Sequence, residues 1–182
     1  LGDVYKRQDL LGQLSQSVPG LTIVSGMAYG IDICAHREAL KNNLPTIGVL
    51  AHGLHTLYPS VHRVTAREAE QNGGLLTEYT TQQPILKINF VARNRIVAGM
   101  TEATLVIESP EKGGALITAH LARDYNREVF ALPGNINQEC SIGCNRLIRD
   151  NVAALVTSAK DIIETMGWET ATRSDVKQQP SL

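Results

Sequence analysis

The chain has 182 residues and a formal net charge of −1, with 43% apolar and 19% charged residues. This length suits one domain with a sizeable core, and the composition is that of an ordinary globular protein. The net charge excludes a protein coated in positive charge, so a nucleic-acid site would have to be a local patch. No apolar run approaches the roughly 18–20 residues of a membrane span. Three cysteines without a signal-peptide pattern indicate a reducing compartment, and we expect a cytoplasmic protein.

Along the chain, segments whose apolar residues have helical spacing alternate with short apolar segments typical of strands. The first eight residues have no clear period and do not begin with Met, so we expect a truncated or non-native start at 1–8. One domain is expected at 9–167, and the polar residues 168–182 are expected to form a disordered tail. Helices are predicted at 9–18, 32–40, 61–71, 115–125, 145–149 and 158–166, strands at 21–24, 46–50, 74–77, 103–107, 129–132 and 153–156, and a polar loop at 135–144.

The predicted strands are short and apolar and mostly lack alternation, which is typical of strands covered on both faces. Their order, with helices between them, predicts an α/β fold with a doubly wound, mostly parallel sheet and helices on both faces. Ligands of such sheets bind at the carboxyl ends of the strands. Candidate sites are therefore expected in the segments that follow the strands.

The first glycine turn, SGMAYGID, starts at Ser25 and joins the strand at 21–24 to the next helix. Gly26 and Gly30 let the backbone bend sharply or approach a ligand, and the free N–H groups of the helix start favour anions. The turn lacks the middle glycine of GxGxxG, and no acid follows about 20 residues later, which argues against a dinucleotide site. Asp32 can itself satisfy the helix N–H groups. A phosphate cradle and a tight structural turn therefore both remain open.

The second glycine turn, EKGGALIT, precedes the helix at 115–125. Gly113 and Gly114 again permit close approach of another backbone or a ligand. Lys112 adds a cation, and Thr118 adds a hydroxyl one turn into the helix. Close packing of helix on sheet and ligand binding explain this pattern about equally well.

The most distinctive stretch is KINFVARNRIVAG, which contains no acidic residue and carries the aromatic Phe90 among three cations. The cations are Lys87, Arg93 and Arg95. Positive charge beside a stacking ring is what single-stranded nucleic acid requires of a protein, because cations hold phosphates and a ring face accepts any base. The alternative is an ordinary helix with one buried apolar face and its cations in water. That face would consist of Ile88, Val91, Ile96 and Val97.

Other chemistries have weaker support in the sequence. His52 and His55 share a loop but lack the further ligands of a zinc site. Glu78 and Glu108 both follow strands, where they act either as acid and base or as loop caps, and the sequence favours loop caps. Neither GxSxG nor a P-loop is present. We predict no catalytic residue, no metal ion and no cofactor.

Seven segments occur in order along the chain: SGMAYGIDICAH, GLHTLYPSVH, LLTEY, FVARNRIVAG, GGALITA, REVFALPGNI and GCNRLIRDNVAALV. Together they strongly resemble the DprA (Smf) family of bacterial DNA-processing proteins. The resemblance implies a Rossmann-like domain that binds single-stranded DNA and is not an enzyme. It also implies a homodimer that helps load the RecA recombinase onto incoming strands during natural transformation.

The resemblance also implies roles for single residues. In the family a lysine and a phenylalanine three residues later contact the strand, and these match Lys87 and Phe90. The arginines of the family's RNR block match Arg93 and Arg95, and both glycine turns match as well. The DNA-binding residues implied in this way are Ser25, Gly26, Gly30, Lys87, Phe90, Arg93, Asn94, Arg95, Gly113, Gly114 and Thr118.

The sequence departs from the family pattern in two respects. Gly113 stands where the family usually has Ser, which removes one hydroxyl from the edge of the pocket. The family's first Rossmann strand, with its GSR loop, and the domains that flank the Rossmann-like domain are not found in the sequence. We therefore expect a sheet that lacks its first strand and has unpaired edges.

Two alternatives come from other functional classes. Nucleoside-monophosphate phosphoribohydrolases of the lysine-decarboxylase-like family use a PGGxGTxxE turn with a catalytic Glu, whereas EKGGALITAHLA has neither the GT pair nor that Glu. The third possibility is a protein–protein module whose surface serves mainly dimer and recombinase contacts.

Overall fold

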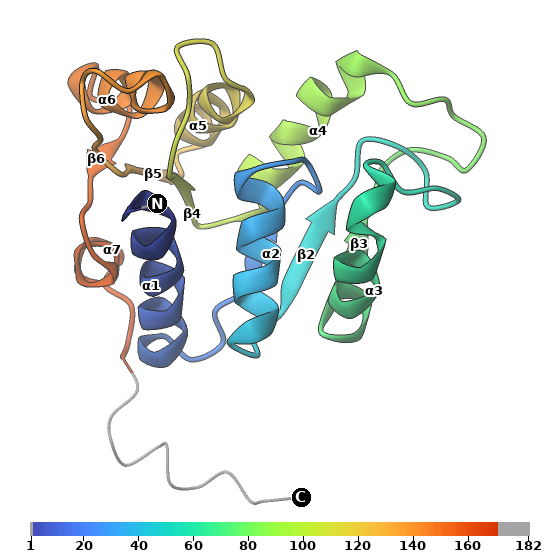
Figure 1. Cartoon of the computed structure of the whole chain (residues 1–182), viewed down its shortest axis with the longest axis horizontal. Coiled ribbons are helices and arrows are strands. Elements are labelled where there is room, and N and C mark those ends of the chain that lie inside the picture. Colours follow the sequence, from blue (N-terminus) through green and yellow to red (C-terminus); the bar gives the residue numbers. More distant parts are fainter. Residues whose placement is uncertain (1, 171–182) are drawn as a thin grey trace, which may run out of the picture.

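The computed structural model describes residues 2–170, with side chains from residue 9 onward. Within this range, helices and strands alternate along the chain (Figure 1). They are α1 (Gly2–Ser17), β1 (Ile23–Ser25), α2 (Ile31–Lys41), β2 (Thr46–Val49), η1 (Ser60–His62), α3 (Arg63–Gln71), β3 (Gly73–Leu76), α4 (Lys87–Met100), β4 (Ala103–Val106), α5 (Gly114–Asp124), β5 (Glu128–Ala131), η2 (Glu139–Ser141), α6 (Ile142–Arg149), β6 (Ala154–Leu155) and α7 (Ala159–Met166). In the described range, no helix is both long and apolar enough to cross a membrane.

The strands form two parallel sheets of three strands, in the orders β1–β2–β3 and β4–β5–β6. Val24 pairs with Ile47 in the first sheet, and Leu105 pairs with Phe130 in the second. The edge strands β1 and β4 belong to different sheets. The predicted α/β fold with parallel strands and intervening helices is confirmed.

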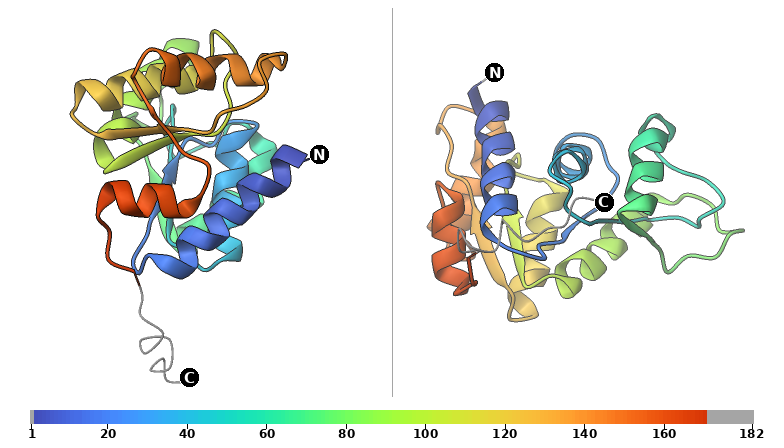
Figure 2. Two further views of the ribbon diagram at one scale, coloured as in Figure 1. Left: turned by 90° about the vertical axis from the view of Figure 1, so that its left-hand side faces the viewer. Right: turned by 90° about the horizontal axis from the view of Figure 1, so that it is seen from below.

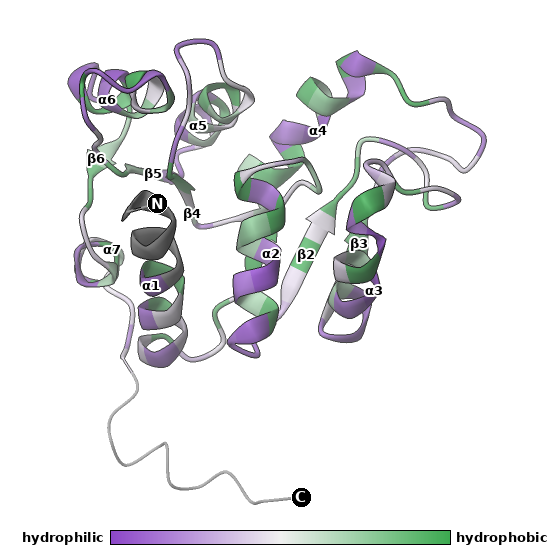
Figure 3. Cartoon of the chain, in the orientation of Figure 1, coloured by the Kyte–Doolittle hydropathy of each residue, from purple (hydrophilic) through white to green (hydrophobic). Residues whose placement is uncertain are grey.

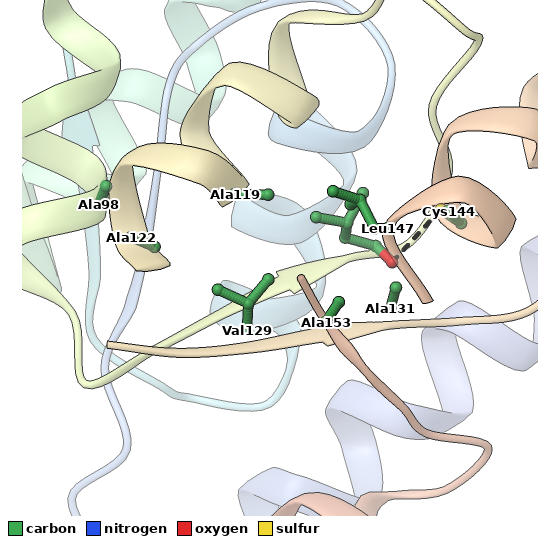
Figure 4. Close-up of a cluster of buried hydrophobic side chains, with 9 residues drawn as sticks. Ala98, Ala119, Ala122, Val129, Ala131, Cys144, Leu147 and Ala153 are labelled. Atoms are coloured by element: carbon green, nitrogen blue, oxygen red, sulfur yellow. Dashed lines mark hydrogen bonds between the residues drawn. The ribbon is translucent and has the colours of Figure 1, made fainter. Parts of the chain in front are cut away.

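The second sheet is covered on both faces. On β5, Val129 and Ala131 face a core cluster that includes side chains of α5 and α6, and Cys144 of α6 donates its thiol to the Val106 carbonyl at 3.6 Å (Figure 4). Phe130, between them, faces a second cluster with side chains of α1 and α7. Because neighbouring residues of a strand point to opposite faces, this short apolar strand fills both cores.

The first sheet packs against α2 and α3, which lie side by side in Figure 1. The cluster between them and the sheet includes Met27, Ile33, Leu50, Ala66 and Ala69. Helix α4 contacts β1, β2 and α5 and so connects the two sheets. Its N-terminal end and the loop before it project from the body of the protein (Figures 1 and 2).

Several boundaries differ from the sequence-based prediction. Helix α1 begins at Gly2, and α6 begins at Ile142, inside the predicted loop 135–144. Gly143 and Cys144, in the additional first turn of α6, are buried. Because the residues around them are mostly polar, the sequence does not indicate a helix there. Ser158, the first residue of the predicted helix 158–166, forms a capping box with Asp161 at the start of α7.

The predicted tail begins with an ordered residue. The Trp168 indole donates to the Glu102 carboxylate at 3.0 Å, and the ring packs against the cluster of α1 and α7. The tail from residue 171 to 182 lies outside the described residues.

The buried-face interpretation of α4 is wrong for its first two turns. Ile88 and Val91 are 71% and 48% exposed, whereas Asn89 and Arg93 are buried. Figure 3 shows hydrophobic segments on α4 and on the loop that precedes it. The helix thus turns polar side chains inward and apolar side chains outward near its N-terminus, the reverse of an ordinary surface helix.

Candidate nucleic-acid interface

Helix α4 has an open N-terminus. Its cap residue, Leu86, makes no side-chain hydrogen bond to the helix, and the first turn has no acidic residue. Lys87 is exposed and forms no ion pair among the residues that the structure describes. The free N–H groups and the lysine charge both favour an anion at this end of the helix.

Arg93 is buried, with 5% of its surface exposed. Its Nη1 donates to the carbonyl of Val49 at the end of β2, and a Cβ added to Gly26 would lie 2.5 Å from its guanidinium. Burial lowers the pKa of Arg93, while the nearby charge of Asp32 acts in the opposite direction. Arg93 therefore holds α4 against the ends of β1 and β2. That it also contacts DNA, as the family resemblance implies, stays a prediction.

Asn94 connects α4 to the second glycine turn. Its Nδ2 donates to the Gly114 carbonyl at 3.5 Å. Helix α5 begins at this turn with Gly113 as cap, without a capping side chain and without an acid in its first turn. The first N–H groups of α5 therefore remain open to an anion.

The side chains of the second turn are partly used within the protein. A Cβ at Gly113 would overlap the Ser109 hydroxyl, so the serine usual in the family would require the Ser109 side chain to move. The Thr118 hydroxyl donates back to the Gly114 carbonyl at 3.4 Å. The turn can therefore offer a ligand its backbone and the exposed side chain of Lys112.

The first glycine turn is closed by its own aspartate. One Asp32 oxygen accepts from the Ser25 hydroxyl at 3.0 Å, and the other accepts from the Ala28 N–H at 3.2 Å. Gly30, the cap of α2, has φ of 85°, which only glycine adopts easily. Of the two interpretations left open by the sequence, this geometry favours the tight structural turn.

Arg95 is exposed and forms an ion pair with Glu78 after β3. The pair lies at the surface, with 51% of the arginine side chain and 34% of the glutamate side chain exposed. Arg95 is thus within reach of a ligand, but the carboxylate of Glu78 competes for it. Because Glu78 is engaged in this pair, it is a poor candidate for one of two catalytic carboxylates.

Phe90 is half-buried and touches a ring that the sequence analysis did not single out. Its centroid lies 5.9 Å from that of Tyr58, and the two ring planes meet at 72°. Tyr58 comes from the loop after β2 and is 49% exposed. Only the family-like string GLHTLYPSVH contains it, and no local pattern links it to residue 90.

His52 and His62 have structural partners. Buried His52 accepts a hydrogen bond from the Tyr58 N–H at 3.1 Å, and buried His62 bonds the Met27 carbonyl at 2.9 Å. Among the described residues, no three histidine, cysteine or acidic side chains form a group able to hold a metal ion.

A sequence model of the family "DNA recombination-mediator protein A" matches residues 6–167. Protein Smf of Escherichia coli K12 is 44% identical over 148 residues, which make up 81% of this chain and 39% of that protein. DNA processing protein DprA of Streptococcus pneumoniae is 41% identical over 143 residues, which make up 79% of this chain and 50% of that protein. The chain thus spans half or less of the length of these two relatives.

Two solved structures share the fold, each with a TM-score of 0.80. DNA processing protein A of S. pneumoniae is 38% identical, and the match covers 90% of this chain and 56% of that one. The protein from Helicobacter pylori, whose structure concerns a unique single-stranded DNA binding mode, is 30% identical, with 91% and 74% covered. The family match over most of the length, together with the shared fold, shows that the chain belongs to the DNA recombination-mediator protein A family.

Proposed function

We propose that this chain is the single-stranded DNA-binding part of a cytoplasmic DNA-processing protein. The observation that carries the proposal is the N-terminal half of α4, which presents exposed Lys87, half-buried Phe90 and exposed Arg95 beside uncapped helix N-termini. These groups supply the cations and the ring that a single strand needs. The single-stranded DNA binding mode of the H. pylori relative supports the same conclusion.

In this proposal Lys87 and Arg95 hold phosphates, and Phe90 stacks a base. Backbone N–H groups at Gly113 and Gly114 hold a further phosphate next to Asn94. Arg93 and the closed first turn, with Ser25, Gly26 and Gly30, fix the position of α4. Bases and phosphates thus meet separate groups on α4 and at the start of α5.

The test is fluorescence anisotropy with labelled poly-dT and a matched duplex at two salt concentrations. We expect tighter, salt-sensitive binding to the single strand, weakened about five- to a hundredfold by Phe90→Ala. Lys87→Ala should weaken binding and reduce the salt slope by about 0.7, the value for one single-strand phosphate. Lys160→Ala, an exposed lysine on α7, is the matched control. Equal effects of the two lysine variants would contradict the proposal.

We further propose that the whole protein forms a homodimer and helps load RecA during natural transformation, and that it is not an enzyme. Light scattering measures the first property, and RecA filament growth on protein-coated single strands measures the second. Incubation with AMP tests for an enzyme, because a phosphoribohydrolase would release free adenine.

A further inference from the structure

The loop between β2 and η1 holds the backbone of Tyr58 in place. The His52 ring, 1% exposed, lies between two backbone groups of this loop. Its Nδ1 is 3.0 Å from the Gly53 carbonyl, which can only accept, and its Nε2 accepts from the Tyr58 N–H at 3.1 Å. This pattern requires a neutral imidazole with hydrogen on Nδ1.

The same loop is anchored to the segment after β3. The Thr77 hydroxyl donates to the His52 carbonyl at 2.8 Å. A Cβ at Gly53 would lie 2.8 Å from the Thr80 carbonyl carbon, so the two segments touch backbone to backbone. The half-exposed Tyr58 ring is therefore mounted on a well-packed loop.

The rings of Tyr58 and Phe90 form an edge-to-face pair. Their planes meet at 72°, so bases stacked on the two rings would also be far from parallel. Neighbouring bases in a duplex are parallel and stacked on each other, whereas a single strand can turn between one base and the next. In an edge-to-face pair each ring keeps a face that its partner does not cover.

We propose that Tyr58 stacks a second base beside the one on Phe90, and that the angle between the rings selects a turned single strand over a duplex. This inference rests on the proposed function. His52 is the positioning residue of Tyr58, and Lys87, one turn before Phe90 on the same helix, lies where it can neutralise the adjoining phosphate.

The first experiment compares variants in binding to poly-dT. Tyr58→Leu keeps an apolar contact with Phe90 but removes the π-face, and we expect affinity to fall at least about fivefold. Tyr58→Phe should bind within about twofold of wild type, since the ring remains. Tyr125→Leu is the matched control, because Tyr125 is 43% exposed and packs near Gly99 at the other end of α4. Thermal unfolding monitored by circular dichroism verifies that each variant is folded.

The second experiment separates stacking by Tyr58 from support of Phe90. In the Phe90→Ala background, Tyr58→Leu should still weaken binding severalfold, although the touching rings need not be additive. An abasic oligonucleotide of the same length should bind wild type and Tyr58→Leu equally, because it offers no base. His52→Gln, which keeps an acceptor, should retain more affinity than His52→Leu.

The outcomes are distinct. If Lys87→Ala weakens binding but Tyr58→Leu leaves it unchanged, or if Tyr58→Leu has no effect once Phe90 is removed, the inference fails and the proposed function stands. If the abasic strand responds to Tyr58→Leu as strongly as poly-dT does, stacking is also overturned. If wild type does not prefer the single strand, both the function and the inference fail.

Discussion

Arg93 and Asn94, neighbours on α4, connect this helix to two different glycine turns. Arg93 Nε donates to Asn94 Oδ1 at 3.2 Å. The Arg93 guanidinium reaches the Val49 carbonyl and lies against Gly26, while Asn94 reaches the Gly114 carbonyl. The pair therefore fixes α4 relative to the carboxyl ends of strands in both sheets. The position of the helix in turn determines where its exposed residues lie.

Removing Arg93 should affect stability more than removing Arg95. Arg93→Met leaves the buried Val49 carbonyl without this donor, and we expect the free energy of unfolding to fall by about 2–3 kcal/mol. Arg95→Met removes only an exposed ion pair with Glu78, a loss of about 1 kcal/mol or less. Urea denaturation of both variants measures the difference, and equal losses would contradict a positioning role for Arg93.

The sequence predicts the fold better than it predicts the site, because a strand can be recognised from a short run of apolar residues. Short apolar runs such as 46–50 and 103–107 lie within a residue of β2 and β4. The buried face of helix α4 cannot be recognised in this way, because its buried residues include the polar Asn89 and Arg93. Arg93 bonds the carbonyl of Val49 at the end of β2, which is distant in the sequence, and a local apolar period cannot reveal such a contact.

The contact of Tyr58 with Phe90 illustrates the same limit. The two rings are 32 positions apart, and neither lies in a periodic pattern that points to the other. The two glycine turns can be recognised in the sequence, but the sequence does not show whether a side chain closes each turn. In the folded protein Asp32 closes the first turn, whereas the second has no side-chain cap.

Gly114→Ala tests whether the second turn contacts DNA through its backbone. A Cβ there would come no closer than 4.0 Å to its nearest neighbour, Asn94 Nδ2, so the variant should fold normally. If a phosphate sits on the first N–H groups of α5, the methyl group should obstruct it and weaken binding to poly-dT about tenfold, the value of a hydrogen bond to a charged group. Gly12→Ala on α1, whose Cβ would be 3.8 Å from Asn42, is the matched control. Unchanged affinity of Gly114→Ala would remove this turn from the interface.

Stability should depend on the protonation of His36 in α2. This ring is fully buried between the Thr46 hydroxyl, at 2.7 Å, and the Gly26 carbonyl, at 2.6 Å. Burial lowers the pKa of His36 below its usual 6.5, although the bond to Gly26 and the charge of Asp32 act against this shift. Below about pH 6.5 the unfolded chain binds a proton that the folded chain does not, so the folded state loses stability as the pH falls toward the folded pKa.

The pH effect is measured by urea denaturation at pH 7.5 and 5.5. We expect wild type to lose at most about 1.4 kcal/mol per pH unit from this group. His36→Gln is less stable at both pH values but should lack this part of the pH dependence. His120→Gln, an exposed histidine on α5, should keep it. If His36→Gln keeps the full pH dependence, the effect belongs to another group.

Glu78→Gln should strengthen DNA binding, because it frees Arg95 from a competing carboxylate. An exposed ion pair contributes about 0.2–1 kcal/mol, so we expect a gain in poly-dT affinity of up to about fivefold. The salt slope should steepen by up to about 0.7 as Arg95 takes up one phosphate. Glu164→Gln breaks a comparable exposed pair with Lys160 on α7 and should leave affinity unchanged.

A double variant identifies Arg95 as the residue that Glu78 restrains. Arg95→Gln should weaken binding, and in that background Glu78→Gln should add far less than it does alone, since the freed partner is absent. If Glu78→Gln strengthens binding equally with and without Arg95, its effect is a general loss of negative charge near α4. If Arg95→Gln and Glu78→Gln both leave affinity and salt slope at the wild-type values, Arg95 does not contact the strand, and the phosphate contacts of α4 reduce to Lys87 and its open N-terminus.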